Sequence, residues 1–336
     1  MKKIKTLLFI MLIVIISCGQ NTKDKNRIDY KQELKELAVN KEDVKGNSIF
    51  FVEYRSTKCR IEIYVNDKLL VKSYKYFRDS QGNKYINQFL LKSKNQKVKI
   101  NIYPTKGDVF DKHSSFRIEL SFLTKELLLS ERFDEQDYFI EYSTDVLKKN
   151  TDGSPFLDDD NSFVRKVNIE GLSYFEKEFE FDAEIPFENE ALQNSKDLRK
   201  LNTHALEQKV LAQYQAFANS VKNKNEQMYW EMYYNKGAYF VKANLFTKED
   251  IEDFIKEGEL YYNKMTYPAI ENYELVFYDE GRLVCFESKS SDLEFRGKSP
   301  LIATAINPKD SSDVFRNPIQ FYFHMHKDST ALKPMY

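Results

Sequence analysis

The sequence is poor in glycine, proline and cysteine, and it has no excess of either charge. Only 10 Gly and 8 Pro occur among 336 residues, too few for a fibrous or low-complexity chain. With 51 Lys and Arg against 52 Asp and Glu, the chain lacks the basic excess of general nucleic-acid-binding proteins, so no nucleic-acid partner is expected. Apolar residues make up 42% of the chain, which excludes intrinsic disorder. The composition therefore predicts a globular protein, and its length predicts two domains.

The sequence also lacks the motifs of common catalytic sites. There is no Gly-x-Ser-x-Gly, no His-Glu-x-x-His, and no Ser-x-x-Lys followed by Lys-Thr-Gly. Gly297-Lys298-Ser299 is similar to the end of a phosphate-binding loop, but Asp292 stands where the first glycine of that loop would be. No cofactor is expected, and a non-catalytic function is favoured over an enzymatic one.

The chain has no apolar run long enough to cross a bilayer. Its longest run, Leu7–Ile16, would extend about 15 Å as a helix, half of a ~30 Å hydrocarbon core. Three lysines precede this run, and Ser17 and Cys18 follow it. This order of a cationic segment, a short apolar segment and a small residue predicts a signal peptide over residues 1–17.

The junction at Ser17-Cys18 resembles the lipobox of bacterial lipoproteins. That resemblance implies that Cys18 is lipidated, carries palmitate and becomes the mature N-terminus. Gly19, in place of Asp, implies the outer membrane, on its periplasmic or its exposed side. The start Ser17-Cys18-Gly19-Gln20 and the preference for Lys over Arg are similar to those of Bacteroidota-type lipoproteins. The alternative is a secreted protein cut by the ordinary signal peptidase.

The periodicity of apolar residues changes twice along the mature chain. Residues 18–45 read as a tether that ends in a short helix near residues 30–39. Residues 46–186 alternate with a period of two, which predicts an all-β antiparallel sandwich. Residues 187–336 predict an α+β domain with two helices, at 198–221 and after Thr247, followed by an antiparallel meander. The predicted strands of the sandwich are 49–54, 60–65, 69–76, 88–91, 98–103, 116–122, 138–142 and 175–185.

The order of elements over residues 195–336 resembles that of nuclear-transport-factor-2-like domains. In that fold a curved sheet wraps long helices and leaves a pocket, so the resemblance implies a pocket in the C-terminal domain.

Three groups of residues are candidates for a site. His324 and His326, two apart on a predicted strand, would share one face and could contribute half of a zinc site, although no complete metal site can be assembled from the sequence. Tyr229, Trp230 and Tyr233 form an aromatic cluster that suits either a binding surface or a packed core. The remaining cysteines, Cys59 and Cys285, are expected in different domains as two separate buried thiols.

Together these observations favour a lipid-anchored envelope protein that acts as a non-catalytic binding module for a glycan or a protein partner. One alternative is a hydrolase-like enzyme with a pocket in the C-terminal domain, in which His324, His326 or Glu287 would supply acid–base chemistry. Another is a periplasmic lipoprotein of the immunity or chaperone type.

Overall fold

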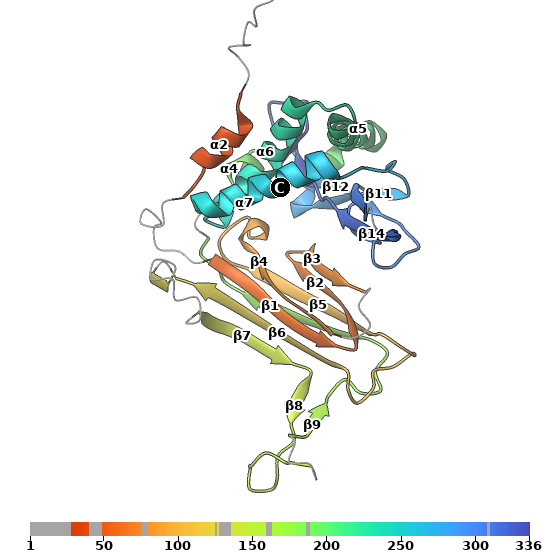
Figure 1. The fold of residues 1–336 in the computed structure, drawn as a ribbon. Helices are drawn as coiled ribbons and strands as arrows, with labels where there is room; N and C mark the ends of the chain where they lie inside the picture. The colour runs from red at the N-terminus through yellow and green to blue at the C-terminus, as the bar shows by residue number, and fades with distance from the viewer. Residues whose placement is uncertain are drawn as a thin grey trace, which may run out of the picture.

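The computed structural model describes residues 28–39, 49–74, 79–124, 126–127, 136–158, 163–185, 189–307 and 310–336. It confirms a mostly antiparallel β protein with a few helices. Figure 1 shows helices α2, α5, α6 and α7 on one side of the molecule and the two large sheets on the other, with β8 and β9 at the end farthest from the helices. Among these residues, no helix combines the length and apolar character needed to cross a membrane.

Two four-stranded antiparallel sheets make up the β half in a sandwich-like arrangement. Sheet A has the strand order β4-β1-β6-β7, and sheet B has the order β10-β5-β2-β3. The strands of sheet A are β1 (Ile49–Thr57), β4 (Asp79–Tyr85), β6 (Ser115–Leu123) and β7 (Asp137–Ser143). The strands of sheet B are β2 (Cys59–Val65), β3 (Lys68–Ser73), β5 (Gln96–Pro104) and β10 (Phe175–Phe181). A separate pair, β8 (Asp145–Leu147) and β9 (Arg165–Val167), extends from this half.

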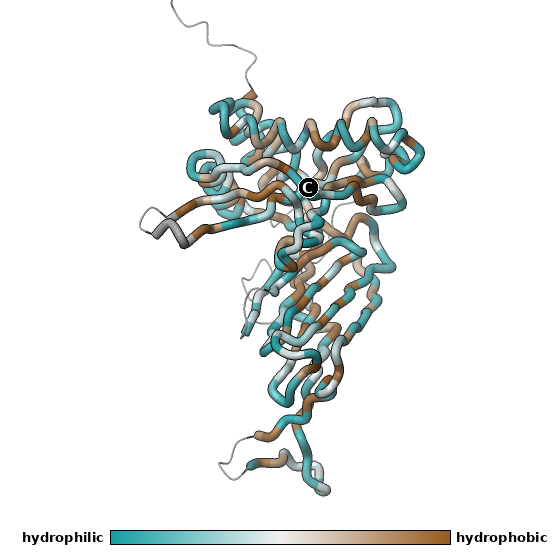
Figure 2. The backbone as a smooth tube through the Cα atoms, turned by 90° about the vertical axis from the view of Figure 1, so that its right-hand side faces the viewer, coloured by the Kyte–Doolittle hydropathy of each residue, from teal (hydrophilic) through white to brown (hydrophobic). Residues whose placement is uncertain are grey.

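The alternation that predicts the sandwich is visible in the packing. Ile61, Ile63 and Ile100 are fully buried, whereas their neighbours along the strands carry polar groups on the opposite face of sheet B. Figure 2 shows brown and teal residues alternating along the strands of this half. The strand predictions differ from the structure in this half at several places. Asn87–Phe89 forms a 3-10 helix, η2, which overlaps the start of the strand predicted at 88–91. The edge strand β4 was not predicted because its sequence is almost entirely polar, and the short strands β8 and β9 were not predicted either.

The C-terminal half contains three long helices, so the prediction of two helices is wrong by one. Helix α6 is the missed helix, because its aromatic residues fit a buried helix or a buried strand equally well. A short helix, α4, and two 3-10 turns, η4 and η5, complete the helical elements of the described residues in this half. Their bounds are α4 (Glu190–Gln193), η4 (Leu198–Lys200), α5 (Thr203–Lys222), α6 (Glu226–Ala243), α7 (Lys248–Lys264) and η5 (Asp279–Gly281).

The strands of this half form an interrupted meander. The order β11-β12-β15-β16 makes one sheet, and β13 and β14 form a separate hairpin between β12 and β15 in the sequence. Their bounds are β11 (Tyr273–Tyr278), β12 (Leu283–Ser288), β13 (Ile302–Asn307), β14 (Asp310–Pro318), β15 (Phe323–His324) and β16 (Lys333–Pro334).

Helices α6 and α7 approach each other closely at two glycines. A Cβ atom at Gly237 of α6 would lie 2.5 Å from the ring of Phe254, and one at Gly258 of α7 would lie 2.8 Å from Trp230. Helix α7 begins with the predicted capping box, in which the Thr247 and Asp250 side chains each accept from the other residue's backbone N–H. The glycines therefore let the large aromatic side chains of each helix fill the space between the two helices.

The N-terminal helix α2 (Tyr30–Glu36) packs on the C-terminal helices although it precedes the sandwich in the sequence. Leu34 is fully buried in the same core cluster as Trp230. The Lys31 Nζ atom lies 2.8 Å from Glu259 and 4.6 Å from the centre of the Trp230 ring. Helix α2 therefore belongs to the helical side of the molecule.

A single apolar core cluster joins the two halves. The C-terminal residue Tyr336 packs with its ring centre 6.0 Å from that of Phe89 in the sandwich half. Cys59 and Cys285 belong to this same cluster and are both free, buried thiols, as predicted. The Lys68 side chain, fully buried in β3, forms an ion pair with Asp279 of the C-terminal half at 2.9 Å. The two halves thus share both apolar packing and a buried charge pair.

Candidate binding face on sheet B

The outer face of sheet B carries two rows of polar side chains that run across the strands. The register places Arg60 opposite Tyr103, and Glu62 opposite both Asn101 and Lys72. We call the first set the tyrosine row and the second the carboxylate row. The tyrosine row comprises Tyr174, Tyr103, Arg60 and Tyr74; the carboxylate row comprises Glu176, Asn101, Glu62 and Lys72.

The tyrosine row is a continuous set of ring contacts. The ring centres of Tyr103 and Tyr174 are 5.1 Å apart, and those of Tyr74 and Tyr103 are 5.8 Å apart. The Arg60 guanidinium lies 5.4 Å from the Tyr74 ring centre. Tyr174 is 40% exposed, and the other two tyrosines are partly exposed. Burial raises the pKa of all three hydroxyls, so they remain neutral hydrogen-bond donors near pH 7.

The carboxylate row is organised around the buried Glu62 carboxylate. It accepts hydrogen bonds from Lys72 Nζ at 2.7 Å, from Tyr74 Oη at 2.9 Å and from Tyr64 Oη at 3.0 Å. Burial by itself would raise the pKa of Glu62, but these donors and the Lys72 charge together hold it below its usual value. Glu62 is therefore a fixed anion, whose hydrogen bonds orient the tyrosine side chains around it.

The exposed end of the two rows lies at β10. The Tyr174 hydroxyl donates to Glu176 at 2.6 Å and accepts from the Asn101 side-chain amide N–H at 2.9 Å. The Glu176 carboxylate also pairs with Lys99 at 2.8 Å and is about half exposed. This end of the face thus offers a hydroxyl, a carboxylate and an ammonium group to solvent beside an exposed aromatic ring.

The other end of the rows is closed by the C-terminal half. The Lys72 ammonium donates to the Arg296 carbonyl oxygen at 2.9 Å, and the Tyr74 backbone N–H donates to Glu294 at 2.7 Å. A second carboxyl group, Glu287 of β12, accepts a hydrogen bond from Tyr278 there. Burial raises the pKa of Glu287 above its usual value, opposite in direction to the shift of Glu62.

The two predicted histidines occupy different environments. His324 is buried, and its Nδ1 atom lies 2.9 Å from Ser195 Oγ, whereas the His326 side chain is 42% exposed. Ser195 Oγ donates its only proton to the Ala191 carbonyl oxygen. The bond between His324 and Ser195 therefore has the Nδ1–H group as donor and Ser195 Oγ as acceptor. No group of three or more His, Cys, Asp or Glu residues suited to a metal ion occurs in the described part of the chain. Among the described residues, His324 and His326 therefore have no third ligand with which to hold a metal ion.

The aromatic cluster of Tyr229, Trp230 and Tyr233 lies in the core between α6 and α7. All three residues are buried, and the hydroxyls of Tyr229 and Tyr233 donate to backbone oxygens of α7 at 2.8 and 3.0 Å. Their burial favours the packing interpretation over a binding surface. Cys18 lies outside the described residues, so its lipidation stays a prediction.

No motif in the sequence predicts the tyrosine row. Its signal was the alternation of Arg60, Glu62 and Tyr64 with apolar residues on β2, which marks an outward face. That pattern could not show that residues 60, 103 and 174 meet, since their proximity depends on the pairing of strands distant in sequence.

Comparison of the chain with models of protein families, with curated proteins and with solved structures finds no match. The likeness to nuclear-transport-factor-2-like domains therefore stays a prediction.

Proposed function

We propose that this chain is a lipid-anchored envelope protein, attached through Cys18, that binds a glycan on the outer face of sheet B. The observation that carries the proposal is the tyrosine row above the carboxylate row, with Tyr174 exposed at its open end. Aromatic rings provide flat apolar faces for the C–H faces of sugar rings, and nearby carboxylates and amides bond sugar hydroxyls. A face built from these two groups in adjacent rows suits a polar ligand with apolar faces.

The rigidity of the face supports a binding role. The Glu62 carboxylate holds the Tyr64 and Tyr74 hydroxyls, and Tyr74 in turn contacts Tyr103. Side chains that are already fixed lose little conformational freedom when a ligand binds. The C-terminal half fixes the same rows from its side through Glu294 and Arg296, so both halves of the chain contribute to the site.

A glycan array probed with the labelled protein tests this proposal, followed by calorimetric titration of each hit. We expect Tyr174→Ala to weaken binding about tenfold, the equivalent of one lost aromatic contact. Tyr138→Ala is the matched control, because Tyr138 is a similarly exposed tyrosine at 44% but lies on sheet A. Equal affinities for the two variants, or an array without hits, would reject the glycan proposal.

The lipid anchor is tested separately from the ligand. Cys18→Ala should abolish metabolic labelling with palmitate and release the protein into the soluble fraction. Protease treatment of intact cells that carry a tag after Tyr336 then reports the side of the outer membrane. Palmitate labelling that persists in Cys18→Ala would contradict the anchor.

A hydrolase is the second candidate, in which Glu287 of β12, the acceptor of a hydrogen bond from Tyr278, would supply the proton. Burial raises the pKa of Glu287 above its usual value, which is the direction that a general acid needs. Incubation of an array hit with the protein and with Glu287→Gln distinguishes this candidate from simple binding. Product release by the native protein and its loss in the variant would support hydrolysis, and an unchanged ligand would leave a binding protein.

A further inference from the structure

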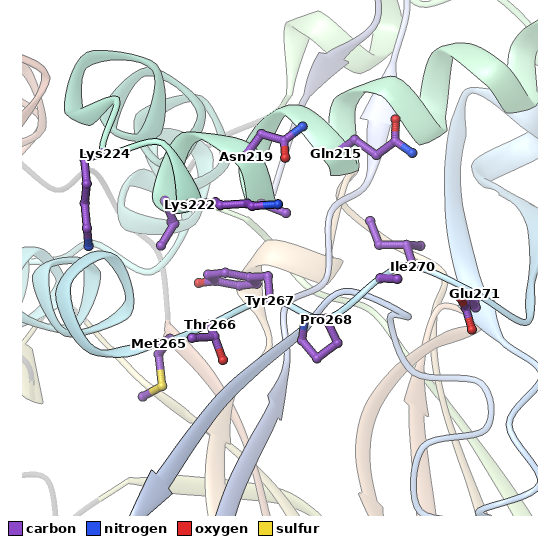
Figure 3. Close-up of a pocket in the computed structure, with 13 residues that line it drawn as sticks. Gln215, Asn219, Lys222, Lys224, Met265, Thr266, Tyr267, Pro268, Ile270 and Glu271 are labelled. Carbon is purple, nitrogen blue, oxygen red and sulfur yellow. The ribbon is translucent and has the colours of Figure 1, made fainter.

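A pocket separate from sheet B opens between helix α5 and the chain segment that follows α7. Its volume is about 710 Å³, within the usual range for ligand sites. Figure 3 shows α5 along one side of this pocket and residues 265–271 along the other, with Lys224 near one end and Glu271 near the opposite end. We call it the α5 pocket.

One wall of the α5 pocket is a polar face of the helix. Gln215, Asn219 and Lys222 are spaced by four and three residues, so they lie on one side of α5. The apolar residues Tyr214 and Phe217 of the same helix are buried in the core. The amide side chains of Gln215 and Asn219 can each donate and accept hydrogen bonds at the pocket.

The opposite wall is an extended segment with free backbone groups. Thr266 exchanges both of its backbone hydrogen bonds with Thr304 of β13, each at 2.8 Å. From Tyr267 to Glu271, no backbone hydrogen bond to another described residue occurs. Pro268 has no N–H, but the other four residues of this stretch retain theirs. Backbone groups that are not paired within the fold bond to water or to another chain.

The two ends of the pocket carry opposite charges. Lys222 and Lys224 form no ion pair with any carboxylate of the described residues, and neither does Glu271 at the other end. The Lys224 ammonium lies 5.4 Å from the ring centre of Tyr262. A ligand that is anionic at one end and cationic at the other would match this arrangement.

We propose that the α5 pocket binds an extended peptide with its C-terminal carboxylate toward Lys222 and Lys224. The peptide would run antiparallel to residues 267–271 and pair with their backbone groups, while Gln215 and Asn219 bond its other edge. A peptide of five extended residues would span about 17 Å. An N-terminal ammonium or a basic side chain of the peptide would lie near Glu271. This site is independent of the glycan proposal, since it shares no residue with sheet B.

Fluorescence anisotropy with a labelled pool of pentapeptides tests the site on the purified protein. One pool has free C-terminal carboxylates, and a second pool of the same composition is amidated. We expect the protein to bind the free-acid pool about tenfold more tightly than the amidated pool. Lys222→Glu should remove that preference. Lys248→Glu is the control, because Lys248 is an exposed lysine at the first position of α7, about 24 Å from the end of that helix.

A second variant tests the backbone pairing without a change of charge. Ala269→Pro removes one N–H from the exposed segment and should weaken binding of both pools. Tyr174→Ala should leave peptide binding unchanged, which separates this site from the proposed glycan face. Absence of saturable binding up to about 1 mM peptide would overturn the proposal, as would an equal preference for free acids in the native protein and in Lys222→Glu.

Discussion

The buried pair of Lys68 and Asp279 gives the sharpest expectation about how the two halves hold together. The Lys68 side chain is completely shielded from solvent, and its Nζ atom lies 2.9 and 3.1 Å from the two Asp279 oxygens. In Asp279→Asn the ammonium would stay buried without its counter-charge. Breaking a buried pair from one side costs about 3–5 kcal/mol of unfolding free energy. Asp279 has a φ of 51°, which asparagine also adopts, so backbone strain does not confuse the comparison.

The magnitude of the effect can be expressed as a melting temperature. A protein of this size has an unfolding entropy of roughly 0.6 kcal/mol/K, so a loss of about 3 kcal/mol lowers Tm by about 5 °C. Lys68→Met should cost less, because Asp279 is 20% exposed and can be hydrated. The double variant should return to within about 1 kcal/mol of the native protein, since no unpaired charge remains buried.

Thermal unfolding followed by circular dichroism measures these differences, and an exposed ion pair supplies the control. Lys58 and Asp111 lie 3.1 Å apart with side chains 42% and 54% exposed. Asp111→Asn should therefore change stability by less than about 1 kcal/mol. If Asp279→Asn lowered Tm no more than Asp111→Asn, or if the double variant were no more stable than Asp279→Asn, the buried-charge reasoning would be refuted.

Four further substitutions have expected outcomes. Burial lowers the pKa of His324 from 6.5 to about 4. As the pH drops through that window, the unfolded chain takes up the proton first, so the folded state loses up to about 3 kcal/mol of stability. His324→Gln should flatten the curve of Tm against pH between 6.5 and 4, and an unaltered curve would contradict this pKa shift. Glu287→Gln should leave Tm at pH 7 unchanged or raise it, because burial disfavours the charge of Glu287. Glu62→Gln should lower Tm, because the Lys72 ammonium loses its counter-charge. Differential scanning calorimetry measures both Tm values, and the reverse order would argue against both pKa directions. Gly258→Ala should destabilise the protein by about 1–3 kcal/mol in urea unfolding, because the added Cβ would lie 2.8 Å from the Trp230 ring. This cost should exceed the gain from the better helix propensity of alanine. A stabilised variant would show that α6 and α7 can move apart without cost.

Local patterns in the sequence predicted much of the secondary structure. The hairpin of β2 and β3 turns at Asn66 and Asp67, which both have positive φ, as the polar pair between two apolar runs indicates. The capping box at Thr247 marks the start of α7 correctly. Two of the missed elements, β4 and α6, carry sequences without a distinctive period, one because it is an edge strand and the other because it is buried nearly all round.

In the strands and helices with a clear period, the sequence by itself determined which residues face a core, because the periods of 2 and 3.6 are properties of the local backbone. It also placed the apolar segment before Cys18 and predicted no nucleic-acid partner. Only the tertiary structure decided which surfaces are built from distant segments. Tyr174 reaches Tyr103 through the pairing of β10 with β5, and Lys72 meets Arg296 through docking of the two halves. These contacts join residues as many as 224 positions apart, and no local pattern encodes such a separation.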